Sequence, residues 1–162
     1  MATKQTNIIN HNQLKIEDTC HMHKSSIEGL QNLINEYNIQ NVLEFGSGYS
    51  SYWFAKRVKQ LYTIDTNSNW FPQNLINTEC YLLDKNGKNI ENIINKINHI
   101  NFDLVLIDCK GNLRPKIFEY MQKINWKILS VHDYPRDKEK YNKNLFSNLQ
   151  TEMFNSLKIW IK

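Results

Sequence analysis

The segment Asn41-Val42-Leu43-Glu44-Phe45-Gly46-Ser47-Gly48 gives the clearest indication of the fold of this chain. Its first five residues predict a short strand, and a helix is predicted over residues 50–58, directly after the two glycines. Glycine has no Cβ, so a turn of this kind lets a ligand approach the backbone closely. A dinucleotide-binding fingerprint would place a third glycine at position 51, where this chain has Ser51. The turn therefore predicts a ligand site but disfavours a nicotinamide dinucleotide.

The alternation of strand and helix continues on both sides of this stretch. Before it, Ser25 or Ser26 is expected to cap a helix whose apolar residues recur every three or four positions up to Tyr37. After it, we predict strands over residues 61–64, 80–83, 102–107, 126–131 and 157–161, and helices over residues 70–77, 90–97, 115–123 and 136–150. Repeated strand–helix units predict an α/β fold with an open, mostly parallel sheet and helices on both faces.

Five predicted strands end in or beside a carboxylate. These residues are Glu44, Asp65, Asp84, Asp108 and Asp133. Open parallel sheets bind ligands beyond the carboxyl ends of their strands, so the five are candidate site residues. Glu44 would repel a pyrophosphate but suits a ligand with an ammonium or sulfonium group. Asp65 can accept hydrogen bonds from two ribose hydroxyls, and Asp84 can accept one from an adenine amino group.

Residues 25–161 resemble the class I S-adenosylmethionine-dependent methyltransferases in this arrangement. Residues 42–48 are similar to the first motif of that family, Asp65 to its ribose-binding acidic residue, and residues 158–161 to its closing antiparallel strand. The resemblance implies a Rossmann-like doubly wound sheet with an antiparallel last strand, in a single domain over residues 25–162. It also implies S-adenosylmethionine as cofactor, bound by Glu44, Gly46, Ser47, Gly48, Tyr49, Ser50, Asp65, Thr66 and Asp84.

The chain departs from this family at both ends. Residues 1–24 are polar and predict an irregular lead-in, which the resemblance would make a lid; His21 and His23 there are more typical of surface histidines. The stretch between the fifth and last predicted strands is short, so the usual terminal hairpin is expected to be trimmed or to lack a strand. Little sequence remains for substrate recognition. We therefore expect methyl transfer to an oxygen or nitrogen of a small or medium-sized molecule, or an oligomer or partner subunit that completes the site.

Three residues are our candidates for catalysis: Asp108, His132 and Asp133. Methyl transfer to a hydroxyl or amine needs a general base near the methyl group. The two aspartates could equally be loop or N-cap carboxylates. Arg114 could orient an anionic substrate or lie on the surface at a helix end. The sequence also resembles metal-dependent O-methyltransferases at Asp108, but their Asp-Asn pair is replaced by His132-Asp133 or Asp133-Tyr134. Gly111 stands at their lysine position, with Lys110 one place early. No metal ligand is predicted, and a divalent metal is not favoured.

The amino-acid composition indicates which partners and which cellular setting the protein has. The net charge of +4 comes mainly from scattered lysines, which does not favour a nucleic-acid partner. No apolar run is long enough for a membrane span, and three widely spaced cysteines form no disulfide or zinc pattern, which predicts a cytoplasmic setting, or the host cytoplasm for a viral protein. The abundance of Asn, Ile and Lys indicates an AT-rich genome. The alternatives to a methyltransferase are a catalytically silent binding subunit and an aminopropyltransferase on the same fold.

Overall fold

The computed structural model of the chain describes residues 22–162. Most of the predicted lead-in, including His21, lies outside the described residues. His23 is described, and it is the N-cap of the first helix, where its Nδ1 lies 2.8 Å from the Ser25 hydroxyl. The cap therefore lies two residues before Ser25, and Ser26 instead donates a hydrogen bond to the Phe154 carbonyl from a buried position.

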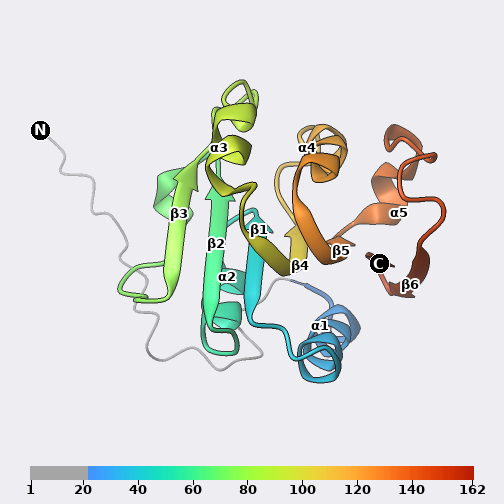
Figure 1. Cartoon of the computed structure of the whole chain (residues 1–162), viewed down its shortest axis with the longest axis horizontal. Helices are drawn as coiled ribbons and strands as arrows, with labels where there is room; N and C mark the ends of the chain where they lie inside the picture. Colours follow the sequence, from blue (N-terminus) through green and yellow to red (C-terminus); the bar gives the residue numbers. More distant parts are fainter. Residues whose placement is uncertain (1–21) are drawn as a thin grey trace, which may run out of the picture.

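The described residues form one seven-stranded sheet with the order β3-β2-β1-β4-β5-β7-β6 (Figure 1). The strands are β1 (Asn41–Phe45), β2 (Gln60–Asp65), β3 (Thr78–Leu82), β4 (Asn101–Ile107), β5 (Asn125–Val131), β6 (Gln150–Phe154) and β7 (Leu157–Ile161). The first five are parallel, and β7 runs antiparallel to both β5 and β6. This confirms the predicted doubly wound, mostly parallel sheet with an antiparallel last strand.

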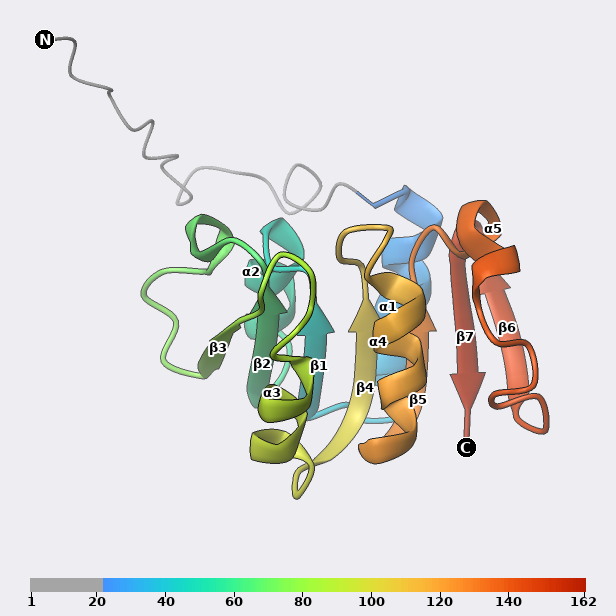
Figure 2. The ribbon, with the colours of Figure 1, turned by 90° about the horizontal axis from the view of Figure 1, so that it is seen from above.

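Helices cover both faces of the sheet (Figure 2). They are α1 (Lys24–Glu36), α2 (Tyr49–Ala55), α3 (Ile90–Ile97), α4 (Arg114–Tyr120) and the single turn α5 (Tyr134–Asp137). The apolar side chains of α3 and α4 pack with one face of the strands, and those of α1 and α2 pack with the other. Strands buried on both faces need nearly continuous apolar sequence, and β4 has it from Phe102 to Ile107 apart from Asp103. In the part of the chain that is described, no helix has the length and apolar character needed to cross a bilayer.

The helix predicted over residues 70–77 is wrong. The chain there forms only a 3-10 turn, Ser68–Trp70, followed by an irregular segment. Pro72 lacks a backbone N–H, and Asn74 has a positive φ of 60°, so a helix cannot continue through either residue. Asn77 holds the segment by donating its side-chain N–H to the Ala55 and Val58 carbonyls.

The helix predicted over residues 136–150 is also wrong, because only α5 and a 3-10 turn, Lys138–Lys140, form there. The Asn142 side chain accepts a hydrogen bond from the Asn144 backbone, which stabilises a turn in place of a helix. Phe146 adopts a positive φ of 61° and packs its ring against Phe118 and Trp126. Aromatic packing therefore fixes this segment against α4 and β5.

The terminal hairpin is complete, which corrects the expectation that it would be trimmed. β6 pairs with β7 from Gln150 opposite Ile161 to Phe154 opposite Leu157. Asn155, with φ of 54°, forms the tight turn between them. Three of the five residues of β6 are exposed, and the strand lies at the edge of the sheet, so its sequence lacks the apolar pattern that marked the other strands.

Candidate functional site

The Gly46-Ser47-Gly48 turn lies at the carboxyl end of β1, where it touches the end of β4. Gly46 has a φ of +108°, and a Cβ added there would lie 2.4 Å from the Asp108 carbonyl oxygen. Asp108 also donates its backbone N–H to the Phe45 carbonyl, at 2.8 Å. A Cβ at Gly48 would meet nothing within 4 Å. The turn therefore needs glycine at position 46 for close backbone contact, and at position 48 it leaves open space beside the backbone.

Glu44 lies beneath this turn with no exposed surface. Its carboxylate accepts hydrogen bonds from the hydroxyls of Ser50, Ser51 and Thr63. Because each hydroxyl has a single proton, Ser51 can then accept from the Gly48 N–H, and Thr63 can accept from Ser47. Glu44 thus fixes Ser47 and Gly48 from below. The enclosed carboxylate positions the turn, whereas the sequence predicted that it would face a ligand.

Burial raises the pKa of Glu44 to about 7, although its three hydroxyl donors and their hydrogen bonds act in the opposite direction. Among the described residues, no cation forms an ion pair with it, and the nearby Asp108 charge adds to the increase. The carboxyl therefore changes its protonation state near neutral pH, inside the network that holds the turn.

Asp65 lies at the end of β2 beside the same turn. Its Oδ2 accepts the Ser47 backbone N–H at 2.9 Å, and its Oδ1 accepts the Asn67 backbone N–H at 2.8 Å. Partial burial raises its pKa, and backbone hydrogen bonds oppose the increase. The Thr66 backbone also donates to this carboxylate, and since its two oxygens have four lone pairs, it keeps acceptor capacity for a ligand hydroxyl.

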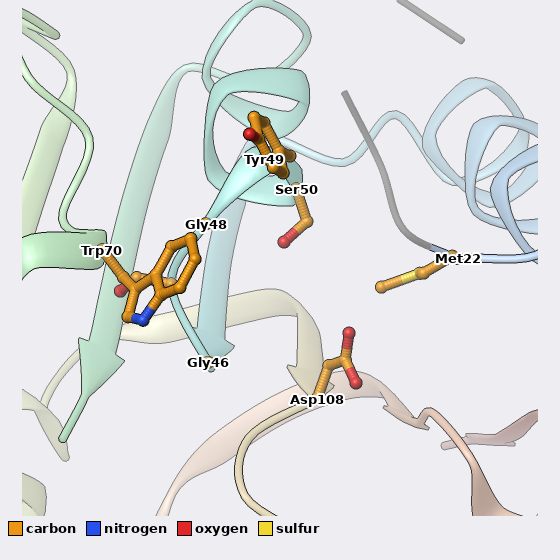
Figure 3. A pocket seen from close by; sticks show the side chains of 8 residues that line it. Met22, Gly46, Gly48, Tyr49, Ser50, Trp70 and Asp108 are labelled. Carbon is orange, nitrogen blue, oxygen red and sulfur yellow. The ribbon is translucent and has the colours of Figure 1, made fainter. Parts of the chain in front are cut away.

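A cavity of about 200 Å³ opens between these elements (Figure 3). It is lined by Met22, Gly46, Ser47, Gly48, Tyr49, Ser50, Trp70 and Asp108. In Figure 3, Trp70 lies on one side of the glycine turn, and Met22 and Asp108 lie on the other. Ligand sites usually measure 300–1,000 Å³, so this cavity would enclose only part of a nucleoside-sized ligand.

Trp70 follows Asp65 closely along the chain, and its side chain would pack on the sheet if residues 70–77 formed the predicted helix. Its side chain is 51% exposed and lines the cavity. The missing helix over residues 70–77 explains the difference, because the 3-10 turn does not return this side chain to the sheet. Six of the predicted site residues are not among those that line the cavity: Glu44, Asp65, Thr66, Asp84, His132 and Asp133. Asp84 is exposed beyond β3, where its backbone N–H is bound by the Asn89 side chain.

The three catalytic candidates lie together at the carboxyl ends of β4 and β5. His132 Nδ1 lies 2.8 Å from Asp108 Oδ1, and His132 Nε2 lies 3.9 Å from Asp133 Oδ1. A carboxylate can only accept hydrogen bonds, so Nδ1 carries the proton in this contact, and in the neutral imidazole Nε2 then has the lone pair. Asp133 occupies the N-cap position of α5, but its side chain makes no capping hydrogen bond. Both aspartates are therefore part of a side-chain cluster and do not act as simple caps.

Arg114 completes this cluster, and the sequence did not assign it there. The side chain is buried, and its Nη2 and Nη1 atoms lie 3.3 Å from Asp108 Oδ1 and Asp133 Oδ2. Its Nε donates to the Cys109 carbonyl at 2.7 Å. The available signal was an arginine immediately before Pro115, just after the Asp108 loop. Ser51 and Thr63 were missed as site residues too, and nothing in their local pattern marks them as partners of Glu44.

Comparisons with known proteins find similar structures but no similar sequence family. No family model matches the chain, and no curated protein matches it. Among solved structures, the MycE methyltransferase of the mycinamycin biosynthetic pathway, in complex with Mg, SAH (S-adenosylhomocysteine) and mycinamycin VI, matches with a TM-score of 0.64 and 14% identity. The match covers 88% of this chain and 50% of MycE.

Two further structures match over most of both chains. TomG, an O-methyltransferase from Streptomyces achromogenes involved in tomaymycin synthesis, in complex with SAM (S-adenosylmethionine), has a TM-score of 0.63 and 14% identity, covering 90% of this chain and 82% of TomG. An O-methyltransferase from Bacillus cereus in complex with SAH has a TM-score of 0.61 and 15% identity, covering 87% and 82%. This is the class I methyltransferase fold. At these identities the likeness establishes the architecture, and the chain spans only about half the length of MycE.

Proposed function

We propose that this chain is an S-adenosylmethionine-dependent methyltransferase that acts on an oxygen of a small-molecule acceptor. The observation that carries the proposal is the cavity lined by the Gly46–Ser50 segment and Asp108, at the edge where β1 and β4 end. This is the position at which open α/β sheets bind ligands. The O-methyltransferase structures of the same fold support this choice of reaction over other chemistry on a nucleotide.

The residues at the β1 and β2 ends fit the cofactor. The open space beside Gly48 admits a ligand against the backbone, and Asp65 retains lone pairs for ribose hydroxyls. Trp70 offers an exposed aromatic face at the cavity for the adenine ring. Thr66 and Asp84 remain proposed contacts farther along the same edge.

The residues at the β4 and β5 ends fit a general base. The cofactor, when bound, would supply an electrophilic methyl group to an acceptor oxygen held in line with it. Asp108 fixes the tautomer and orientation of His132 through the 2.8 Å contact with Nδ1. The Nε2 atom is then the atom that accepts the proton of an acceptor hydroxyl. Asp108 also lines the cavity, which links the base to the cofactor end.

The aminopropyltransferase alternative fits this cluster less well. A polyamine acceptor needs unpaired carboxylates to receive its ammonium groups. Here Arg114 already lies between Asp108 and Asp133. The observation therefore favours a neutral or hydroxyl-bearing acceptor.

The test is release of S-adenosylhomocysteine from S-adenosylmethionine across a panel of hydroxyl-bearing small molecules, with the wild type and His132→Gln. We expect turnover with at least one acceptor and a loss of about 100-fold or more in kcat for His132→Gln, the usual contribution of a general base. Cofactor affinity should be unchanged in the variant. Cofactor binding without turnover of any acceptor would instead support the silent binding subunit.

A further inference from the structure

The ion cluster at the ends of β4 and β5 is built around a buried cation. The Arg114 side chain is only 7% exposed, whereas those of Asp108 and Asp133 are 22% and 30% exposed. One guanidinium nitrogen lies 3.3 Å from each carboxylate, so a single side chain joins the ends of two neighbouring strands. Its third contact, from Nε to the Cys109 carbonyl, fixes the head group against the backbone.

This position is one that two carboxylates and an imidazole would otherwise make attractive to a metal ion. Aspartate oxygens from adjacent loops are suitable ligands for Mg²⁺ or Mn²⁺. Without a cation between them, two carboxylates at this separation would repel each other in partly buried surroundings. Arg114 supplies the positive charge, and it uses Oδ1 of Asp108 and Oδ2 of Asp133.

Two further contacts use the same carboxylate oxygens that receive Arg114. His132 Nδ1 is bound to the same Asp108 oxygen that receives Arg114, and Arg136 Nη2 lies 3.1 Å from Asp133 Oδ2. Among residues 22–162, no group of three or more His, Cys, Asp or Glu side chains is arranged to hold a metal ion. The donor set present here therefore does not fit a divalent cation while Arg114 is in place.

We infer that the Arg114 guanidinium takes the place of a divalent cation in this cluster and that the site works without a metal. Arg114 is then a positioning residue: it holds Asp108, and through Asp108 it holds His132 with Nε2 free. The inference that Arg114 excludes a metal ion depends only on its contacts with Asp108 and Asp133. Its consequence for catalysis, a methyl transfer that is independent of added metal, rests on the proposed function.

The test is a Mn²⁺ titration followed by electron paramagnetic resonance of the free ion, on the full chain. The proteins are the wild type, Asp108→Asn, Arg114→Ala, Arg114→Ala/Asp108→Asn, and Arg136→Ala as the matched control. Arg136 also contacts Asp133, but its side chain is 62% exposed. We expect weak Mn²⁺ binding to the wild type and to Arg136→Ala, and a gain in affinity of at least tenfold at one site in Arg114→Ala. The added Asp108→Asn change should abolish that gain.

Two results would overturn the inference. One is tight Mn²⁺ binding to the wild type that Asp108→Asn removes, because a metal would then displace Arg114. The other is a folded Arg114→Ala protein with no gain in affinity, because the guanidinium would then have no cation site to replace. If Arg114→Ala does not fold, Arg114→Met keeps the side-chain volume, and the wild-type and Asp108→Asn titrations still decide the first point.

Mn²⁺ binding, S-adenosylmethionine binding and methyl-transfer turnover are measured separately in this experiment. Failure to bind S-adenosylmethionine would contradict the proposed function and leave the Mn²⁺ result intact. If turnover is found, the wild-type rate should be unchanged by a chelator. A chelator-sensitive wild-type rate that Mg²⁺ restores would contradict the inference while leaving the methyltransferase assignment in place.

Discussion

The two halves of the sheet edge hold their carboxylates in different ways. At the β1 and β2 ends, Glu44 and Asp65 are bound by hydroxyls and backbone N–H groups. At the β4 and β5 ends, Asp108 and Asp133 are bound by Arg114. Neutral donors leave Glu44 and Asp65 without a compensating cation. The charges of Asp108 and Asp133 are instead compensated by the buried Arg114 guanidinium. Of the first pair, Asp65 is thus left to receive a hydroxyl-rich ligand while the enclosed Glu44 supports the turn, and the second half is suited to an acceptor that does not need a free carboxylate.

Gly46→Ala breaks the contact that joins the two halves, and it should have the largest effect. The new Cβ would lie 2.4 Å from the Asp108 carbonyl oxygen, and the residue has a φ of +108°. Backbone strain and overpacking together should lower the free energy of unfolding by about 3 kcal/mol or more. Urea denaturation measures the loss. Gly48→Ala is the matched control: its φ of +159° also strains an alanine, but its Cβ meets nothing within 4 Å, so the loss should be smaller, and an equal loss there would refute the role of close backbone contact.

Glu44→Gln tests, through the pH dependence of stability, whether the carboxylate without a cation partner titrates near neutral pH. The pKa of Glu44 is about 7 in the folded chain against an ordinary value of 4.5, so the folded state binds this proton more tightly than the unfolded chain does. Its contribution is complete below about pH 4.5 and is lost as the pH rises through 7; the difference amounts to about 3 kcal/mol.

Glu44→Gln should therefore remove a fall in stability between pH 4.5 and 7 that the wild type shows. Chemical denaturation at several pH values in this window measures the difference between the two proteins. Glu119→Gln, a change at an exposed residue of α4, should retain the wild-type pH dependence. A wild-type curve that Glu44→Gln follows in parallel would show that Glu44 does not titrate in this range.

Trp70→Ala tests the cofactor half alone. Loss of the aromatic face at the cavity should weaken S-adenosylmethionine binding about tenfold, a typical contribution of one stacked base. Fluorescence or calorimetric titration measures the change. Tyr37→Ala removes another exposed aromatic ring, at the end of α1, and should bind as the wild type does. Equal affinities for all three proteins would exclude Trp70 from the site.

Arg136→Ala should have the smallest effect and tests the acceptor half. Its ion pair with Asp133 is solvent-exposed, so its removal should change stability by about 0.5 kcal/mol or less. Thermal unfolding compares it with Arg114→Ala, which leaves two partly buried carboxylates without their shared cation and should cost far more. Similar losses for the two variants would contradict the distinction between the buried and the exposed arginine.

The sequence predicts the strands of this fold better than its irregular segments. Buried strands such as β4 must be apolar along most of their length, and that requirement is visible in one sequence. The segments over residues 70–77 and 136–150 were misinterpreted because single residues, Asn74 and Phe146 with positive φ, decide their course. β6 was missed because an exposed edge strand needs no apolar pattern.

The residues of the candidate site were also only partly predictable from the sequence. Carboxylates at strand ends could be found because parallel strands bring their ends to one edge. Their partners could not, because Thr63 and Arg114 reach Glu44 and Asp108 from other elements. Burial also decides what a carboxylate does: Glu44 was expected to face a ligand, and its enclosed position makes it a support for the turn instead.

The proposed function depends on S-adenosylmethionine binding at the carboxyl ends of β1 and β2. Isothermal titration calorimetry with S-adenosylmethionine and S-adenosylhomocysteine, on the wild type and Asp65→Asn, tests it most directly. We predict binding of both ligands in the micromolar range and a loss of at least tenfold in the variant, the cost of weakening charged hydrogen bonds to ribose. Thermal unfolding should show that Asp65→Asn is folded. No heat of binding to the wild type at millimolar ligand, or equal affinities for a folded Asp65→Asn, would contradict the account.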